Sequence, residues 1–388
     1  MQTYEYLAAI VNNHLKGTEV PKRPETISFE EIADIAQRNH LSYMIFSELI
    51  KDETCTEEQV SMMRNSIKAN VIRTLIQVNE LKNMKARFEE AGVKNMPLKG
   101  SILKYIYPRP ELREMSDIDI LIGGDNIDKA SEVLIGMGYD SGTAVKHHDI
   151  YVKKPYMVVE AHRALYDKSV DNNQYKYFVG FDKAVLSEGF NYSYEYKPED
   201  FYVYMVAHAA KHFYAMGCGI RNLIDVYVYL EKYRSVMDME YTREALKQCG
   251  IADFAENMEK LAYDWLEGRK LDEFYESLFT YMVDSGIYGK DENGIWNKFA
   301  DEEKHDISRW ELKKWYFFPP LYYMAEYYPW VEDKSYLLPV AWMIRFFRGV
   351  FMHKGAKKRE MVKTIKNDQI LTYKKIYQRM NLKFSSRF

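Results

Sequence analysis

Two carboxylates lie two residues apart in a run with strand-like composition, Ser116-Asp117-Ile118-Asp119-Ile120-Leu121-Ile122. Side chains at alternate positions of a strand point to the same face, so we expect Asp117 and Asp119 to lie side by side. Two unpaired carboxylates at that spacing repel each other, and one of them would normally take up a proton. A divalent cation removes this repulsion, and Mg²⁺ is usually held by one or two carboxylates together with substrate phosphates. The pattern therefore predicts a metal site that handles phosphate.

A second motif, Pro97-Leu98-Lys99-Gly100-Ser101, precedes the carboxylates and has the pattern of a short strand that turns at Gly100 into a helix. Glycine lets the backbone approach a ligand closely, and the first N–H groups of a helix are free to bind an anion. Phosphate at the turn and metal on the next strand is the arrangement that nucleotidyl transfer requires. Neither motif is specific alone, since an Asp-x-Asp pair in a strand-like run is more often a solvated strand edge, and it is their combination that favours a site.

The elements around these motifs suggest an α+β protein. Residues 1–92 have the pattern of a helical region, in which the capping-box sequences Ser28-x-x-Glu31 and Thr56-x-x-Gln59 each open an amphipathic run. The second run repeats an apolar residue every three or four positions from Val60 to Phe88, which predicts one long helix ending near Gly92. Residues 93–197 change to a strand period and form the predicted αβ core.

Within this core, a hairpin is expected from residues 149–153 and 157–163. On its second strand Val158, Glu160 and His162 share a face. If this strand lies beside the strand of Asp117 and Asp119, Glu160 becomes a third carboxylate of the cluster. The sequence leaves that adjacency open.

Residues 198–350 are predicted to be helical again and contain four more candidate site residues. His208 and Lys211 are three positions apart and share one helix face, while Arg221 and Asp225 lie on the following helix. A structural alternative is a core histidine at position 208, with Lys211 and Arg221 at the surface.

Composition limits the class of protein. The chain has 388 residues, of which 47% are hydrophobic, and a net charge of −3, which is typical of a globular protein with more than one domain. Three widely spaced cysteines form neither a disulfide framework nor a zinc pattern, and we find neither a signal peptide nor a membrane span, so a cytoplasmic location is expected. Residues 351–388 form a basic tail, because 353–388 contain eight Lys and three Arg against one Glu and one Asp. Such a tail is either a solvated helix face or a contact for RNA.

Taken together, these motifs resemble the uncharacterised nucleotidyltransferase family of the DNA polymerase β-like superfamily. The resemblance extends over residues 96–348, and 350–388 lie outside it. It rests on Leu98-Lys99-Gly100-Ser101, Tyr107-Pro108, Arg113-x-x-Ser116-Asp117-x-Asp119, Glu160-x-His162, His208-x-x-Lys211-His212, Arg221-x-x-x-Asp225, Ser285-Gly286-x-Tyr288-Gly289 and Leu338-Pro339-x-x-Trp342-x-x-Arg345.

The resemblance implies a small mixed β-sheet flanked by helices, with an appended helical domain that helps to hold the nucleotide. It also implies that Gly100 and Ser101 bind the triphosphate and that Asp117, Asp119 and Glu160 bind two Mg²⁺ or Mn²⁺ ions and form the catalytic group. Many relatives have Asp in place of Glu160. Residues expected to neutralise or contact the nucleotide are Lys99, Arg113, His208, Lys211, Arg221 and Asp225.

Two metals about 3.5–4 Å apart stabilise both the attacking and the leaving oxygen of an in-line displacement. The leading hypothesis is therefore metal-dependent transfer of a nucleoside monophosphate from an NTP to an acceptor hydroxyl on a small molecule, a protein or an RNA. One alternative is a non-catalytic, nucleotide-binding regulatory or antitoxin-like protein. Another is an RNA-directed transferase that uses the basic tail.

Overall fold

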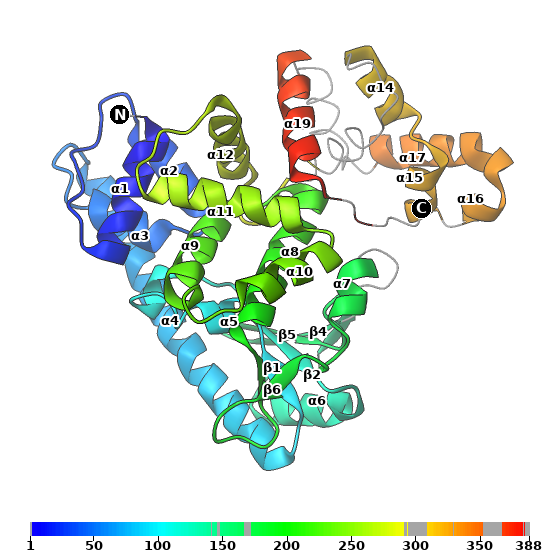
Figure 1. The fold of residues 1–388 in the computed structure, drawn as a ribbon, viewed down its shortest axis with the longest axis horizontal. Coiled ribbons are helices and arrows are strands. Elements are labelled where there is room, and N and C mark those ends of the chain that lie inside the picture. Colours follow the sequence, from blue (N-terminus) through cyan, green and yellow to red (C-terminus); the bar gives the residue numbers. More distant parts are fainter. Residues whose placement is uncertain are drawn as a thin grey trace.

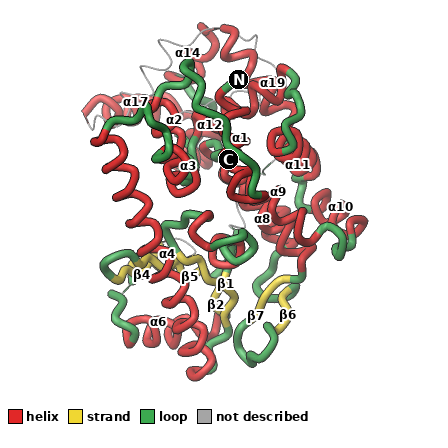
Figure 2. The backbone as a smooth tube through the Cα atoms, turned by 90° about the vertical axis from the view of Figure 1, so that its left-hand side faces the viewer, coloured by secondary structure: helices red, strands yellow, loops and turns green. Residues whose placement is uncertain are grey.

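The computed structural model describes residues 2–140, 142–145, 148–166, 172–290, 293, 309–328, 330–351, 367–382 and 384. Helices dominate these residues and surround one small mixed sheet, which confirms the predicted α+β class (Figure 1). Figure 2 shows the sheet toward one end of the molecule, with most of the helices gathered at the other.

Four helices form the N-terminal region, and two of them begin at the predicted caps. Ser28 Oγ accepts from the N–H of Glu31, and Thr56 forms a complete capping box with Gln59. The long helix ends at Gly92, which has a φ of 65°. The four helices are α1 (Thr3–Lys16), α2 (Phe29–Arg38), α3 (Ser42–Leu49) and α4 (Glu57–Ala91).

The middle of α4 differs from the predicted apolar stripe. Leu75 belongs to that stripe but is 60% exposed, whereas Asn70, Thr74 and Gln77 are buried. Asn70 and Gln77 donate to the main-chain carbonyls of Glu111 and Met115. The buried face is polar here because it binds the backbone of a neighbouring segment, which apolar side chains cannot do.

The main sheet has five strands in the order β1-β2-β5-β4-β3. Strands β2 and β5 are parallel and the other neighbours are antiparallel, and the predicted hairpin is present as β4 and β5. A separate antiparallel pair, β6 and β7, lies beside β1. The strands are β1 (Asn95–Pro97), β2 (Ile118–Ile122), β3 (Thr143–Val145), β4 (His148–Lys153), β5 (Met157–His162), β6 (Ala184–Leu186) and β7 (Tyr194–Tyr196).

The two faces of the sheet have different environments because strand side chains alternate. Ile118, Ile120 and Val159 pack with Met84 of α4 and Leu134 of α6 (Ile127–Gly136) in one apolar cluster. The alternate side chains of β2 and β5 point away from this cluster. The acidic residues therefore face the helical part of the molecule.

That helical part begins with α8 (Pro198–Met216) and α9 (Arg221–Tyr233), which confirm the two predicted helices. The remaining described helices are α5 (Gly100–Leu103), α7 (Asn172–Tyr177), α10 (Met239–Gln248), α11 (Ala252–Leu266), α12 (Glu273–Ser285), α14 (Arg309–Phe317), α15 (Leu321–Tyr327), α16 (Trp330–Asp333), α17 (Leu338–Phe351) and α19 (Asn367–Met380). Short 3₁₀ helices span Pro110–Leu112, Gly124–Asn126 and Ser335–Leu337.

The C-terminal helix α19 is part of the helical core. Ile376, Tyr377 and Met380 are buried, and the helix contacts α11 and α12. Most of the basic segment that precedes it, residues 352–366, lies outside the described residues. The domain boundaries after residues 92, 197 and 350 stay predictions.

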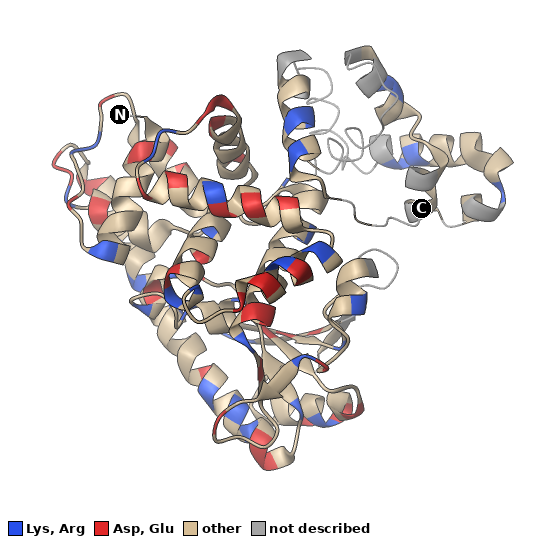
Figure 3. Ribbon diagram, viewed as in Figure 1, with Lys and Arg blue, Asp and Glu red and all other residues tan. Residues whose placement is uncertain are grey.

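Charged side chains of both signs are intermixed on helices such as α10 and α11 (Figure 3). This mixture is typical of solvated helix faces. Within the described ranges, every helix is too short or too polar to cross a lipid bilayer.

Candidate functional site

The turn between β1 and α5 brings Lys99 and Gly100 to the sheet edge. Lys99 has a φ of 45°, an unusual conformation for a residue with a side chain. A Cβ on Gly100 would lie 2.7 Å from Arg113 Nη1 and 2.8 Å from Met115 Sδ, so a larger residue here would displace the side chains of Arg113 and Met115. Helix α5 begins at Gly100, as predicted, and the N–H groups of Ser101 and Ile102 donate to the carbonyls of Leu98 and Lys99. Anion binding at this helix start stays a prediction.

Glu160 lies beside the aspartates, as the hypothesis requires. In the parallel pairing of β2 with β5, Asp119 is opposite Glu160, and Leu121 is opposite His162. His162 Nε2 lies 2.8 Å from Asp119 Oδ1 and 3.6 Å from Glu160 Oε2. Ligand atoms of Asp119, Glu160 and His162 all lie within 4.8 Å of one another.

The carboxylates differ in their electrostatic surroundings. Burial, together with the neighbouring charge of Asp119, raises the pKa of Asp117 to about 6. Burial acts to raise the pKa of Asp119 as well, but Lys99 and His162 outweigh it and hold that pKa well below its ordinary value. Lys99 Nζ donates to Asp119 Oδ1 at 2.8 Å. Burial and the charge of Asp119 raise the pKa of Glu160. Burial therefore disfavours the charged form of all three carboxylates.

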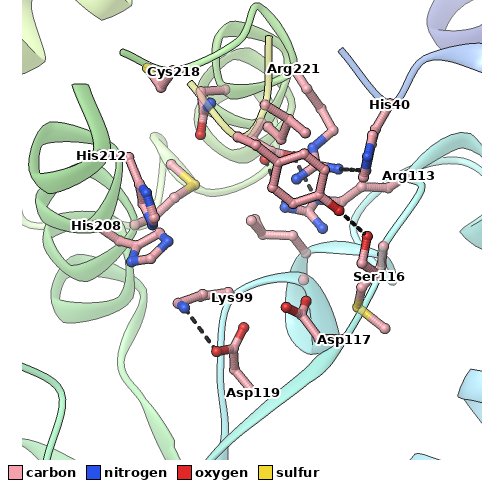
Figure 4. A pocket seen from close by; sticks show the side chains of 18 of the residues that line it. His40, Lys99, Arg113, Ser116, Asp117, Asp119, His208, His212, Cys218 and Arg221 are labelled. Atoms are coloured by element: carbon pink, nitrogen blue, oxygen red, sulfur yellow. Dashed lines mark hydrogen bonds and ion pairs between the residues drawn. The ribbon is translucent and has the colours of Figure 1, made fainter. Parts of the chain in front are cut away.

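A cavity of about 310 Å³ lies between the sheet and α8 and α9. Figure 4 shows Asp117 and Asp119 on one side of it, His208 and His212 on another, and Arg221 opposite the aspartates. Nine of the predicted site residues line this cavity: Lys99, Gly100, Arg113, Asp117, Asp119, Glu160, His208, Arg221 and Asp225.

Ser101 and Lys211, which were also predicted to contact nucleotide, are not among the residues that line the cavity. Ser101 is 1% exposed, and its Oγ has no hydrogen-bond partner among the described residues. Lys211 Nζ lies 5.7 Å from the centre of the Tyr166 ring. Their contact with a nucleotide stays a prediction.

Arg113 and Asp225 form a buried, bidentate ion pair that joins the αβ core to α9. Arg113 Nε and Nη2 donate to the two carboxylate oxygens of Asp225 at 2.7 and 2.9 Å, and Tyr107 Oη also donates to Asp225. Both side chains of the pair are about 5% exposed or less. Asp225 thus holds the guanidinium of Arg113 against Gly100 at the cavity wall.

Arg221 also lines the cavity and is held there by groups from two regions. Its Nη1 donates to the carbonyl of Glu114 at 2.7 Å and lies 3.3 Å from His40 Nδ1. The His40 ring packs edge-on against Tyr288, and Tyr288 Oη lies 2.6 Å from Ser116 Oγ. Burial, and then the charge of Arg113, lower the pKa of Arg221. The two guanidiniums give the cavity a cationic wall opposite its carboxylates.

The two histidines of α8 line the cavity side by side, with ring centres 4.3 Å apart. Burial lowers the pKa of His208 well below its ordinary value, and burial together with Lys99 lowers that of His212 to about 4. Both imidazoles are therefore neutral near pH 7. The His208 side chain is half-buried and reaches the cavity, so its structural role and its contact with nucleotide both stay predictions.

Sequence reasoning assigned no site role to His40, Ser116, His162, His212 or Tyr288. His162 carried a usable signal, because it shares a strand face with Glu160. Tyr288 lies in the glycine-rich motif quoted for the resemblance. His40 carried none, since only the tertiary fold brings the loop between α2 and α3 to this cavity.

The residues at the base of the cavity suit a divalent cation. Asp119 and Glu160 supply carboxylate oxygens within 4.8 Å of one another and of a His162 nitrogen, and Asp117, two residues before Asp119, also lines the cavity. Bound there, a cation would polarise a phosphoryl oxygen and offset charge at the reacting phosphorus.

A mixed sheet with carboxylates on neighbouring strands is the arrangement that the resemblance to nucleotidyltransferases implied. The sequence model described as uncharacterised nucleotidyltransferase matches residues 25–267, more than half of the chain, and the protein belongs to that family. The match ends before the motifs at residues 285–289 and 338–345. Comparisons with curated proteins and with solved structures gave no match.

Proposed function

We propose that the protein transfers a nucleoside monophosphate from an NTP to an acceptor hydroxyl and releases pyrophosphate. The observation that carries this proposal is the pairing of Asp119 with Glu160 across β2 and β5, at the base of a cavity with two guanidiniums on its far wall. Family membership supports nucleotidyl transfer in general.

In this reaction the acceptor oxygen forms a bond to the α-phosphorus while the bond to the bridging oxygen of pyrophosphate breaks. Asp117, Asp119 and Glu160 are the residues that would hold one or two divalent cations, with Mg²⁺ or Mn²⁺ as candidates. Glu160, which lies opposite Asp119 across β2 and β5, is the candidate to accept the hydroxyl proton. Arg221 and Arg113 supply positive charge for the triphosphate.

The test uses the purified full-length chain, NTPs labelled at the α-phosphate, Mg²⁺ or Mn²⁺, and a lysate of the host as the source of acceptor. Wild-type protein is expected to label an acceptor and to release pyrophosphate. Asp119→Asn and Glu160→Gln should each reduce the rate by roughly 10³-fold, because metal binding is worth several kcal/mol at the transition state. Asp128→Asn, on the exposed side of α6, is the matched control and should keep the wild-type rate.

Two outcomes contradict the proposal. The first is a product that forms equally well with the Asp119 and Glu160 variants. The second is tight NTP binding by calorimetry without pyrophosphate release, which favours the non-catalytic regulatory alternative.

A further inference from the structure

His162 occupies a position that the proposed reaction does not explain. It lies on β5 two residues after Glu160, so both side chains face the aspartates. The side chain is 7% exposed, and the same nitrogen, Nε2, is directed at Asp119 (2.8 Å) and toward Glu160 (3.6 Å). An imidazole nitrogen is thus directed to the point where two carboxylates from neighbouring strands converge.

The identity of these donor atoms bears on which metal binds. Mg²⁺ is a hard cation that takes oxygen ligands and gives up its water reluctantly. Imidazole nitrogen instead favours first-row transition metals, whose affinity for nitrogen-containing sites exceeds that of Mg²⁺. A donor set of two carboxylates and one imidazole is therefore better matched to Mn²⁺ and its neighbours in the row.

We propose that His162 Nε2 is a metal ligand and that the site formed by Asp119, Glu160 and His162 selects a transition metal, with Mn²⁺ as the probe ion, over Mg²⁺. The use of this metal in transfer rests on the proposed function, but its binding does not. His162 would exchange its hydrogen bond to Asp119 for a bond to the cation, and Lys99 would release the same carboxylate oxygen.

A second imidazole offers a matched control. His148 Nε2 lies 3.9 Å from Glu160 Oε2, and its ring centre is 5.1 Å from that of His162. It is close enough to be mistaken for the ligand but lies outside the three-residue group. His162→Gln and His148→Gln therefore separate a specific ligand from a general loss of imidazole near the carboxylates.

The experiment measures Mn²⁺ bound to the full-length chain by electron paramagnetic resonance, with histidine labelled by ¹⁵N and with Mg²⁺ as competitor. We expect a nitrogen coupling to bound Mn²⁺ in wild type and in His148→Gln, and its loss in His162→Gln. In wild type, Mn²⁺ should bind at least about tenfold more tightly than Mg²⁺. The His162→Gln substitution should lower the affinity for Mn²⁺ by roughly tenfold or more and the affinity for Mg²⁺ by less than about threefold.

The inference is wrong if wild-type protein binds Mn²⁺ and shows no nitrogen coupling. It is also wrong if His162→Gln lowers the affinities for Mn²⁺ and for Mg²⁺ by the same factor. If His162→Gln fails to fold, His148→Gln decides the question: nitrogen coupling that persists in His148→Gln supports the inference, and coupling that disappears there contradicts it. If the protein catalyses nucleotidyl transfer with Mg²⁺ and shows no nitrogen coupling to bound Mn²⁺, the inference is wrong and the proposed function stands. If nitrogen coupling to bound Mn²⁺ is present but no nucleotidyl transfer occurs, the metal-ligand inference is supported and the proposed function is contradicted.

Discussion

At the scale of single residues, Lys99 and His162 are the two side chains that offset the negative charge of Asp119. Of these, Lys99 carries the ammonium. Its backbone has a positive φ, and its ammonium forms an ion pair with Asp119 at 2.8 Å. Strained backbone of this kind is often found at functional sites. A cation bound by Asp119 competes with Lys99 for the same oxygen. The released ammonium would then be available to a triphosphate in the same cavity.

Lys99→Met is expected to strengthen metal binding and to weaken NTP binding. Removing the competing ammonium should raise Mn²⁺ affinity by about tenfold, since an ion pair at a partly buried site contributes on the order of 1 kcal/mol or more. NTP affinity should fall by a similar factor because one cation is lost from the cavity. Calorimetry with Mn²⁺ and with a non-hydrolysable NTP measures both effects.

The control for this variant is Lys129→Met, which removes an exposed lysine of α6. Unchanged or weaker metal binding by Lys99→Met, relative to this control, would show that Lys99 does not compete with the cation.

At the scale of elements, the long helix α4 positions the segment that carries Arg113. Its buried polar residues bind the carbonyls of Glu111 and Met115, on either side of that arginine. Lys104, directly after α5, is 1% exposed and donates to Gln77 of α4 at 3.0 Å. The cationic wall of the cavity therefore depends on hydrogen bonds to a helix whose own side chains do not line it.

The buried Lys104 should give the protein a measurable pH dependence. Burial, and then the charge of Arg113, lower its pKa from 10.5 to about 8 in the folded protein. Between these values the unfolded chain binds more protons, so the free energy of unfolding rises with pH as the folded lysine loses its proton. From pH 7 to 9 this contribution amounts to about 1 kcal/mol.

Lys104→Met removes this contribution, so its stability relative to wild type should decrease by about 1 kcal/mol between pH 7 and 9. Urea unfolding at both pH values measures the change, and Lys82→Met, on the exposed side of α4, controls for the loss of a lysine charge. A stability difference that stays constant with pH, or that grows, would contradict the low pKa.

At the scale of the whole molecule, the cavity is assembled from regions that are far apart in the sequence. The sheet supplies the carboxylates, α8 and α9 supply His208 and Arg221, and loops after α2 and α12 supply His40 and Tyr288. Asn39 connects these loops, because its side chain donates to the carbonyl of Val283 and accepts from the N–H of Ile220.

The Arg113–Asp225 pair is a buried, bidentate ion pair between the αβ core and α9. Asp225→Ala should destabilise the protein by about 3–5 kcal/mol, because it leaves the Arg113 guanidinium buried without its partner. The double variant Arg113→Met with Asp225→Leu should recover most of this loss, since apolar residues can replace a buried ion pair. Denaturant unfolding measures both.

The same double variant tests the predicted nucleotide contact of these two residues. A stable double variant with wild-type NTP affinity would assign the pair a structural role alone. Loss of NTP affinity in a stable double variant would support the contact. If the double variant and Asp225→Ala lose the same free energy of unfolding, the loss in Asp225→Ala does not come from a buried Arg113 charge without its partner.

Much of this organisation could be predicted from local patterns. Capping-box sequences predicted the starts of α2 and α4, and Gly92 predicted the end of α4. Strand-like patterns in the sequence predicted β2, β4 and β5. These signals are readable because they depend on neighbours within a few residues. The polar face of α4 could not be predicted in this way, since its partners are carbonyls in another segment.

The sequence by itself determined the α+β class, the carboxylate pair at Asp117 and Asp119, and the presence of Glu160 and His162 on one strand face. Only the tertiary structure decided that β5 lies parallel to β2, which brings those two faces together. It also decided that Arg113 pairs with Asp225 and that His40 reaches the cavity. Strand adjacency and long-range ion pairs depend on how distant segments pack, and no periodicity along the chain encodes that choice.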